Sequence, residues 1–127
     1  MEGVVLAMRD GLEIMRGLGV EPSEIRAIGG GARSPLWRRM QADVYRTPVR
    51  RVAVEEGAAY GAALLGHVSG GTFANVEEAT SVVRLLDDVI EPDDARADAY
   101  DAIGERYRAL YPTLREEMHH LGGFTAR

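Results

Sequence analysis

The stretch that decides the fold runs from Ala27 to Trp37 and reads AIGGGARSPLW. Three consecutive glycines follow an apolar segment, and a Ser-Pro pair follows the glycines. Ser34 suits a helix N-cap because its oxygen can accept a backbone hydrogen bond, and Pro35 suits the first helical position. Glycine permits the positive φ that a tight strand-to-helix turn often requires. The stretch therefore predicts a strand, a glycine turn and a helix.

The segments on either side of the glycines predict one βαβ unit. IRAI, before the glycines, is short and apolar and predicts a buried strand, and the helix is expected from Pro35 to about Tyr45. The segment TPVRRVAV carries Val49, Val52 and Val54 and predicts a second strand. Two strands joined by one helix run parallel. The expected fold class is α/β with a short parallel βαβ core.

Helices are expected before and after this unit. Apolar residues from Val4 to Leu18 recur at spacings of three and four and predict an amphipathic helix with one apolar stripe. In EEGAAYGAALLG, the charge of Glu55 and Glu56 suits a helix N-terminus. The small residues from Gly57 to Ala63 should let this helix pack closely on a sheet, with a ligand as the alternative.

Two more helices are expected toward the C-terminus. Asn75 should cap a short helix, with Glu78 in the capping-box position. A long helix should begin at Asp93 or Asp94, and Pro112 should kink or split it. Its apolar stripe consists of Tyr100, Ile103, Tyr107, Leu110, Leu114, Met118 and Leu121.

The composition argues against several classes of protein. A chain of 127 residues with 46% hydrophobic residues is the size of one domain, here residues 1–127. The net charge of −5, with scattered basic residues, disfavours a nucleic-acid partner. The sequence has no Cys and no Lys, which excludes disulfides, thiolate metal sites and a Walker-type phosphate loop. Because no apolar run is long enough for a membrane span, we expect a cytoplasmic protein without a membrane partner.

The glycine turn has three interpretations from its residues. Unpaired N–H groups at the start of a helix can bind an anion such as phosphate, or the turn can serve the chain reversal alone. The third interpretation is a dinucleotide-binding Rossmann turn, because Gly29, Gly31 and Ser34 fall on the three glycine positions of that fingerprint. Glu55 or Glu56 would then be the ribose-binding acid. Serine at the third position and the short chain count against this third interpretation.

The order of these segments resembles the C-terminal domain of the FGGY family of carbohydrate kinases, and within it the xylulokinases most closely. The resemblance rests on GGGARSPLW with a following AD, and on EEGAAYGAALL at the expected distance. The terminal RYRALYP favours xylulokinases over glycerol kinases. The resemblance implies a partial actin-like, ribonuclease H-like ATPase domain, and two such domains in the whole kinase close over ATP and a sugar.

The resemblance also implies which residues contact ATP. The resemblance supports four positions as ATP contacts, namely Gly29, Gly30, Gly31 and Ala32. It gives weaker support to three more, namely Arg33, Ser34 and Trp37. Some relatives place an Asn shortly after the glycines to meet adenine, where this chain has Ser34 and Pro35. Ser34 could instead be only a helix cap, and Trp37 only a core residue.

By the same resemblance, the chemistry of the kinase lies elsewhere in a longer protein. The catalytic Asp and the Mg²⁺-binding motif of the family precede the part that this chain matches, so we expect no catalytic and no metal-ligating residue here. His67, His119 and His120 are too scattered for a metal site. The chain is then a fragment that is inactive alone, belonging to a kinase that uses ATP/ADP with Mg²⁺.

The implied partners are an N-terminal kinase domain, ATP and a sugar. Phosphorylation of D-xylulose to D-xylulose 5-phosphate is the implied reaction. Because open strand edges and uncovered apolar stripes favour self-association, we also expect a homodimer or a swapped arrangement through the first or last helix. A stand-alone helical interaction module that binds no nucleotide is the alternative hypothesis.

Overall fold

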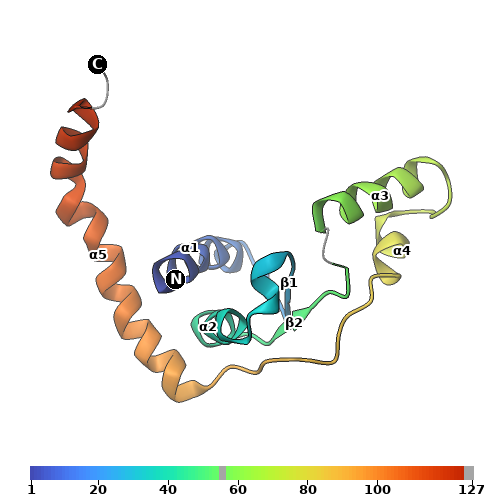
Figure 1. Ribbon diagram of the computed structural model, residues 1–127, viewed down its shortest axis with the longest axis horizontal. Coiled ribbons are helices and arrows are strands. Elements are labelled where there is room, and N and C mark those ends of the chain that lie inside the picture. Colours follow the sequence, from blue (N-terminus) through green and yellow to red (C-terminus); the bar gives the residue numbers. More distant parts are fainter. Residues whose placement is uncertain (55–56, 125–127) are drawn as a thin grey trace.

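The computed structural model describes residues 1–54 and 57–124 and confirms the βαβ core (Figure 1). Its elements, in chain order, are α1 (Glu2–Gly17), β1 (Ile25–Ala27), the 3₁₀ helix η1 (Gly30–Arg33), α2 (Pro35–Tyr45), β2 (Val49–Arg51), α3 (Gly57–Ser69), α4 (Val76–Ser81) and α5 (Asp94–Phe124). Figure 1 shows α1, α2 and the strands at the centre, with α5 on one side and α3 and α4 on the other. Glu55 and Glu56, which we expected at a helix N-terminus, lie outside the described residues.

The two strands form a parallel sheet that is covered along one edge only. Ile25 pairs with Val49, and the register continues for the length of both strands. The segment before α5 runs back along β2, where Val49 and Ile90 exchange two hydrogen bonds of 2.9 Å. Among the described residues, no strand pairs with the other edge of β1. That edge of the sheet is open.

The hydrophobic core lies on both sides of α2. The first cluster joins α1 to α2 and consists of Val5, Leu6, Met40, Val44 and Tyr45. The second cluster joins the sheet and the glycine turn to α2 and consists of Ala27, Ala32, Ala42 and Val49. Burial of these apolar side chains is the main force that holds the unit together. Because α2 contributes to both clusters, it fixes the position of the turn that precedes it.

Helix α1 forms where the sequence predicts it but buries a different face. The buried residues are Val5, Leu6 and Arg9, which lie against α2 and α5. The apolar stripe that we read from the spacing is largely exposed, with Val4 at 56% and Met8 at 50%. Spacing identifies residues that share a face, and the neighbouring helices decide which face is covered.

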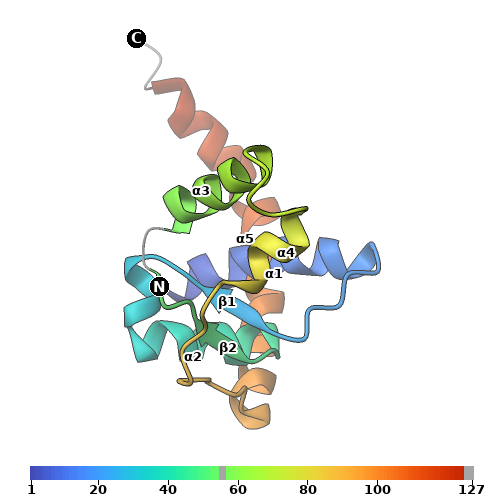
Figure 2. The same cartoon turned by 90° about the vertical axis from the view of Figure 1, so that its right-hand side faces the viewer.

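The long C-terminal helix α5 is tied to the core near its start and continues unbroken past Pro112, so the expected split is absent. The buried carboxylate of Asp43 on α2 accepts the backbone N–H of Asp93 at 2.9 Å and Nε of Arg96 at 2.6 Å. The helix stays in contact with α1 and α2 through Tyr100, Asp101 and Tyr107, and from residue 108 to 123 every residue is exposed. Figure 2 shows it passing behind the central unit and continuing to the C-terminus. Pro112 lies in this exposed half, where a carbonyl that loses its helical partner can bind water.

Helices α3 and α4 form a second, thinly packed arm. The Asn75 cap of α4 is confirmed, because Oδ1 of Asn75 accepts the N–H of Glu78 at 2.9 Å, and the Glu78 carboxylate accepts the N–H of Ala74 at 2.6 Å. Helix α3 has no buried residue, so our expectation that its small residues pack along a sheet is wrong for this chain. Of the glycines of α3, Gly57 approaches a neighbour closely, since a Cβ there would lie 2.5 Å from Cδ1 of Ile28, whereas Gly61 and Gly66 have open space beside them.

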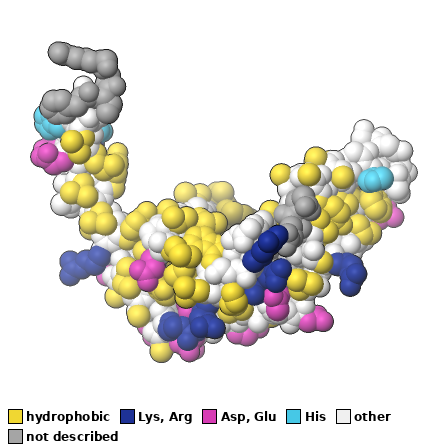
Figure 3. All heavy atoms as spheres, in the orientation of Figure 1, with side chains coloured by type: hydrophobic (Ala, Val, Ile, Leu, Met, Phe, Trp, Pro, Cys, Tyr) yellow, Lys and Arg dark blue, Asp and Glu magenta, His cyan; other side chains and the backbone are white. Residues whose placement is uncertain are grey.

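The molecule leaves more surface uncovered than a compact domain of its mass. Its accessible area is 8778 Å² for 13.8 kDa. The scaling for folded monomers gives about 6,600 Å², which is about 2,200 Å² less. Figure 3 shows hydrophobic side chains gathered over the face between α5 and α3. Apolar surface of this extent marks sites where another polypeptide packs.

Candidate functional site

The glycine turn links β1 to α2 through a backbone conformation that requires glycine at its first position. Gly29 has φ 74° and ψ −176°, a region that residues with a side chain hardly populate. Gly30 then opens η1, and the N–H groups of Ala32 and Ser34 donate to the carbonyls of Gly29 and Gly31, each at 3.1 Å. The turn is therefore fixed by its own hydrogen bonds.

Two backbone donors at the turn are available to a ligand. Within residues 1–54 and 57–124, the N–H groups of Gly30 and Gly31 form no hydrogen bond, and both glycines are exposed. A Cβ built on Gly30 meets no atom within 4 Å, so the space beside it is open. Unpaired N–H groups near a helix N-terminus favour an anionic ligand.

The side chains that follow the glycines mostly serve the fold. Ala32 is 5% exposed and packs in the second core cluster, so only its backbone could meet a ligand. Ser34 is the N-cap of α2, because its Oγ accepts the N–H of Trp37 at 3.3 Å. The cap role that we left open for Ser34 is confirmed. Arg33 is exposed beside the turn.

Trp37 lies directly against the turn, yet it belongs to the core. A Cβ on Gly31 would lie 3.3 Å from Nε1 of Trp37, so any larger residue there would displace the indole ring. The ring is half-buried and packs against the first core cluster. Its position explains why glycine occurs at Gly31 and supports the core role that we left open for Trp37.

A cavity of about 230 Å³ runs beside the open edge of β1, lined by β1, Met8 and one face of α2. Two buried polar atoms line it, Oε1 of Gln41 and the hydroxyl of Tyr45, and neither forms a well-aligned hydrogen bond among the described residues. Burial raises the pKa of Tyr45, and the side chain of Gln41, which lies near its hydroxyl, acts in the opposite direction. The two side chains thus leave hydrogen-bonding capacity at this face of α2.

The sequence interpretation missed this face of α2, although a signal existed. Trp37, Gln41 and Tyr45 are spaced by four residues and therefore lie on one face of the helix. It also missed Arg38, which is 4% exposed and whose Nη1 donates to the carbonyl of Asp88 at 2.8 Å. Arg38 anchors the returning segment to α2, and nothing in the pattern WRRM distinguishes it from a surface arginine.

Among the described residues, no group of three or more His, Cys, Asp or Glu side chains could hold a metal ion. The resemblance places the Mg²⁺ ligands in other parts of the kinase. His67 contacts Thr72 and Phe73 instead, with ring centroids of His67 and Phe73 6.1 Å apart.

In the described part of the chain, no helix has the length and apolar character needed to cross a membrane.

Comparison with known proteins identifies the class to which this fold and turn belong. Residues 1–70 match the C-terminal domain of the FGGY family of carbohydrate kinases. The match spans more than half of the chain, and the chain belongs to this family. The predicted family and the partial actin-like, ribonuclease H-like fold are confirmed, and the Rossmann interpretation is set aside.

Several relatives within that family are xylulose kinases. The xylulose kinase of Staphylococcus epidermidis is 34% identical over 116 residues, which is 91% of this chain and 23% of that protein. The xylulose kinase of Escherichia coli is 37% identical over 120 residues, 90% of this chain and 24% of that protein. The crystal structure of xylulose kinase from Rhodospirillum rubrum matches 93% of this chain and 24% of its own, with TM-score 0.74 and 36% identity. The chain spans about a quarter of the length of these relatives.

Proposed function

We propose that this chain forms one wall of the nucleotide site in an ATP-dependent sugar kinase that converts D-xylulose to D-xylulose 5-phosphate. Membership of the carbohydrate kinase family supports the reaction class. The xylulose kinases among its relatives support the acceptor. In this proposal the glycine turn from Gly29 to Arg33 contacts ATP, with Ser34 and Trp37 holding the turn in place.

The observation that carries the proposal is the pair of unpartnered, exposed N–H groups of Gly30 and Gly31 in front of α2. Phosphoryl transfer depends mainly on positioning of the phosphates and on stabilisation of their charge. The two N–H groups would bind and orient an anionic part of the nucleotide, and glycine keeps side chains out of its path. The catalytic carboxylate and the Mg²⁺ ligands would come from other parts of the kinase.

We further propose that residues 1–127 act as one domain and that the N-terminal part of the kinase completes it. The bonds of Asp43 to Asp93 and Arg96 support the first statement, because they join α5 to the part matched by the family. The open edge of β1 supports the second. An added strand would satisfy backbone groups along that edge.

A chimeric enzyme tests the proposal. The segment of Escherichia coli xylulose kinase that aligns with this chain would be replaced by residues 1–127. We expect the chimera to phosphorylate D-xylulose with ATP, while residues 1–127 alone show no activity. A folded chimera that neither binds ADP nor phosphorylates D-xylulose would contradict the assignment of this chain to the nucleotide site.

Variants of the turn separate nucleotide binding from folding. Gly30→Val should raise KM for ATP about tenfold or more with little change in KM for D-xylulose, because the new side chain enters the open space beside the turn. The matched control is Gly11→Val, since Gly11 also has nothing within 4 Å of an added Cβ and lies on α1. An unchanged KM for ATP in Gly30→Val would remove the turn from the nucleotide site.

The alternative, an interaction module without nucleotide binding, predicts a different outcome. The folded chimera would then bind no ADP in calorimetric titration, whether position 30 carries glycine or valine. The exposed apolar faces favour this alternative as far as they indicate protein contacts. The kinase proposal requires the same exposed apolar faces, because other parts of the kinase would cover them. The calorimetric result therefore decides between the two functions.

A further inference from the structure

The segment between α4 and α5, residues 82–93 and named here the return segment, pairs with β2 out of regular register. Val49 pairs with Ile90, and Val52 pairs with Leu85, both in antiparallel orientation. Between these two bridges β2 has two residues and the return segment has four, whereas a regular antiparallel ladder has equal numbers. The extra residues form a β-bulge, a feature that redirects the side chains it contains.

Asp88 lies in this bulge, and Arg38 of α2 binds it at two points. Nη1 of Arg38 donates to the carbonyl oxygen of Asp88 at 2.8 Å, and Nη2 lies 3.0 Å from the carboxylate. Arg38 is buried, whereas the side chain of Asp88 is 40% exposed. Arg51 of β2 lies 3.5 Å from the same carboxylate. The planar fork of the guanidinium suits such a two-point contact, which a lysine could not make.

Arg38 belongs to the first turn of α2 and is connected to the glycine turn by backbone hydrogen bonds. Its N–H donates to the carbonyl of Ser34, and the N–H of Ser34 donates to the carbonyl of Gly31, each at 3.1 Å. The buried apolar residues of α2, from Met40 to Tyr45, all follow Arg38. Arg38 is therefore the buried residue of α2 nearest to the glycines. Figure 1 shows the return segment passing β2 and α2 on its way to α5.

We propose that Arg38, held by Asp88, is a positioning residue for the glycine turn. The contact fixes the first turn of α2 against the return segment and so sets where the N–H groups of Gly30 and Gly31 lie. Arg38 acts through the helix backbone and does not itself meet a ligand. Its effect on nucleotide binding rests on the proposed function of the turn. A binding group that is misplaced by about 1 Å can cost up to about a hundredfold in rate.

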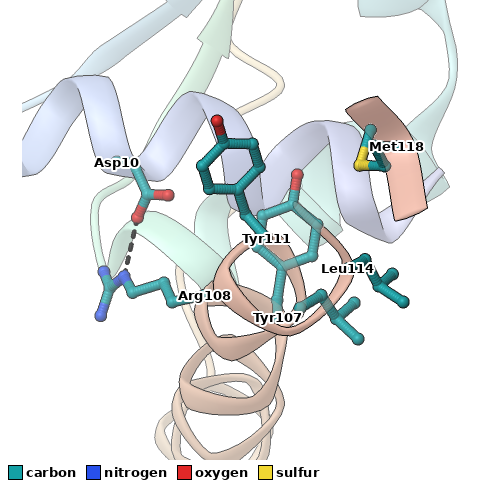
Figure 4. A pocket seen from close by; sticks show the side chains of 7 residues that line it. Asp10, Tyr107, Arg108, Tyr111, Leu114 and Met118 are labelled. Carbon is teal, nitrogen blue, oxygen red and sulfur yellow. Dashed lines mark hydrogen bonds and ion pairs between the residues drawn. The ribbon is translucent and has the colours of Figure 1, made fainter. Parts of the chain in front are cut away.

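Amide hydrogen exchange of the purified chain tests the positioning role without any nucleotide. The N–H groups of Ala32 and Ser34 form the hydrogen bonds that close the turn, so their exchange rates report its rigidity. Arg38→Met should raise both rates about tenfold or more. Arg108→Met is the matched control and should leave them unchanged, because Arg108 binds Asp10 at 2.9 Å between α5 and α1 at the surface (Figure 4). Unchanged rates in Arg38→Met would overturn the proposal.

A milder variant covers the case in which loss of the buried arginine unfolds the chain. Asp88→Asn removes the charge of the pair but keeps the carbonyl that accepts the hydrogen bond from Nη1 of Arg38. It should raise the same two exchange rates by a smaller factor, about threefold, because a neutral acceptor replaces a charged one. If exchange instead rose equally along α1, α5 and the turn, Arg38 would serve general stability and the positioning role would be contradicted.

Kinetics of the chimeric kinase separate this inference from the proposed function. Arg38→Met should raise KM for ATP about tenfold and leave KM for D-xylulose within about twofold. Arg96→Met releases α5 from Asp43 and should change neither KM by more than about twofold, so an equal effect in both variants would contradict the positioning role. If Gly30→Val raises KM for ATP and Arg38→Met does not, only the positioning role fails. If neither variant raises KM for ATP although exchange at the turn increases, only the nucleotide site fails.

Discussion

Helix α2 and the distal half of α5 have similar apolar spacing but opposite surroundings. In α2, seven of the 11 residues are buried, including Met40 and Val44. In α5, every residue from 108 to 123 is exposed. Periodicity therefore identifies the face that a helix offers, whereas burial depends on whether the same chain supplies a surface to cover it. The two helices provide matched sites at which this difference can be measured.

The largest expected effect is a methionine pair that measures the comparison directly. Met40→Ala should lower the free energy of unfolding by about 2–5 kcal/mol, because it leaves a cavity in the first core cluster. Met118→Ala should change it by less than about 0.5 kcal/mol in the monomer, because Met118 is 56% exposed. Urea unfolding of both variants gives the two values. Equal losses would show that the distal half of α5 is packed as tightly as α2.

The attachment of α5 to α2 is expected to have the next largest effect. Asp43→Ala should cost about 2–3 kcal/mol, because the N–H of Asp93 loses its acceptor and Arg96 loses its charged partner. Thermal unfolding should shift downward by about 10 °C. Asp98→Ala is the control, since Asp98 is 73% exposed and its bond to Arg46 lies at the surface. A thermal shift no larger than that of the control would show that α5 is held by other contacts.

Relieving or adding strain at the glycine turn should change the free energy of unfolding by less than the loss of Asp43 does. Gly29→Ala should cost about 1–2 kcal/mol, because Gly29 has φ 74°. Gly30→Ala should leave the free energy of unfolding within about 0.5 kcal/mol, since Gly30 has no positive φ and its Cβ would meet open space. Chemical denaturation compares the pair. If Gly30→Ala proved the more destabilising, the described turn conformation would be wrong.

The smallest expected effect is the pH dependence contributed by the half-exposed carboxylate of Asp101, which bonds to Arg46 and to the buried Arg9. The hydrogen bond from Arg46 holds the pKa of Asp101 below its usual value, and Arg9 adds to this shift. A carboxyl with a depressed folded-state pKa stabilises the fold above its unfolded pKa, near 3.9, and loses this contribution as the pH falls through the folded value. Because Asp101 is 52% exposed, the contribution should be below about 1 kcal/mol.

Asp101→Asn measures this contribution. The difference in Tm between the natural chain and the variant should be present at about pH 6 and shrink as the pH falls below the unfolded pKa, near 3.9. A difference that stays constant across this range would assign the effect to lost hydrogen-bond geometry and not to charge.

The sequence predicted local structure well because its signals are local. Ser34 and Asn75 cap the helices as expected, and both strands and the turn occur where the pattern places them. Propensities and capping act within a few residues, so they can be read without knowledge of the tertiary structure.

The sequence did not predict the buried polar contacts, because these join residues far apart in the chain. Arg38 meets Asp88, and Asp43 meets Arg96, across some fifty positions. Nor could periodicity show that Met8 on α1 is half exposed, since that depends on the partner of the helix. Among the expected site residues, Ala32 is recognisable as a core residue only once the second cluster is known.

The most direct test of the central claim is a crystal structure of the chimeric kinase with ADP bound. We expect a nucleotide oxygen within about 3.2 Å of the backbone nitrogen of Gly30 or Gly31. ADP bound elsewhere in the enzyme, with both nitrogens facing only solvent, would contradict the assignment of this turn to the nucleotide site.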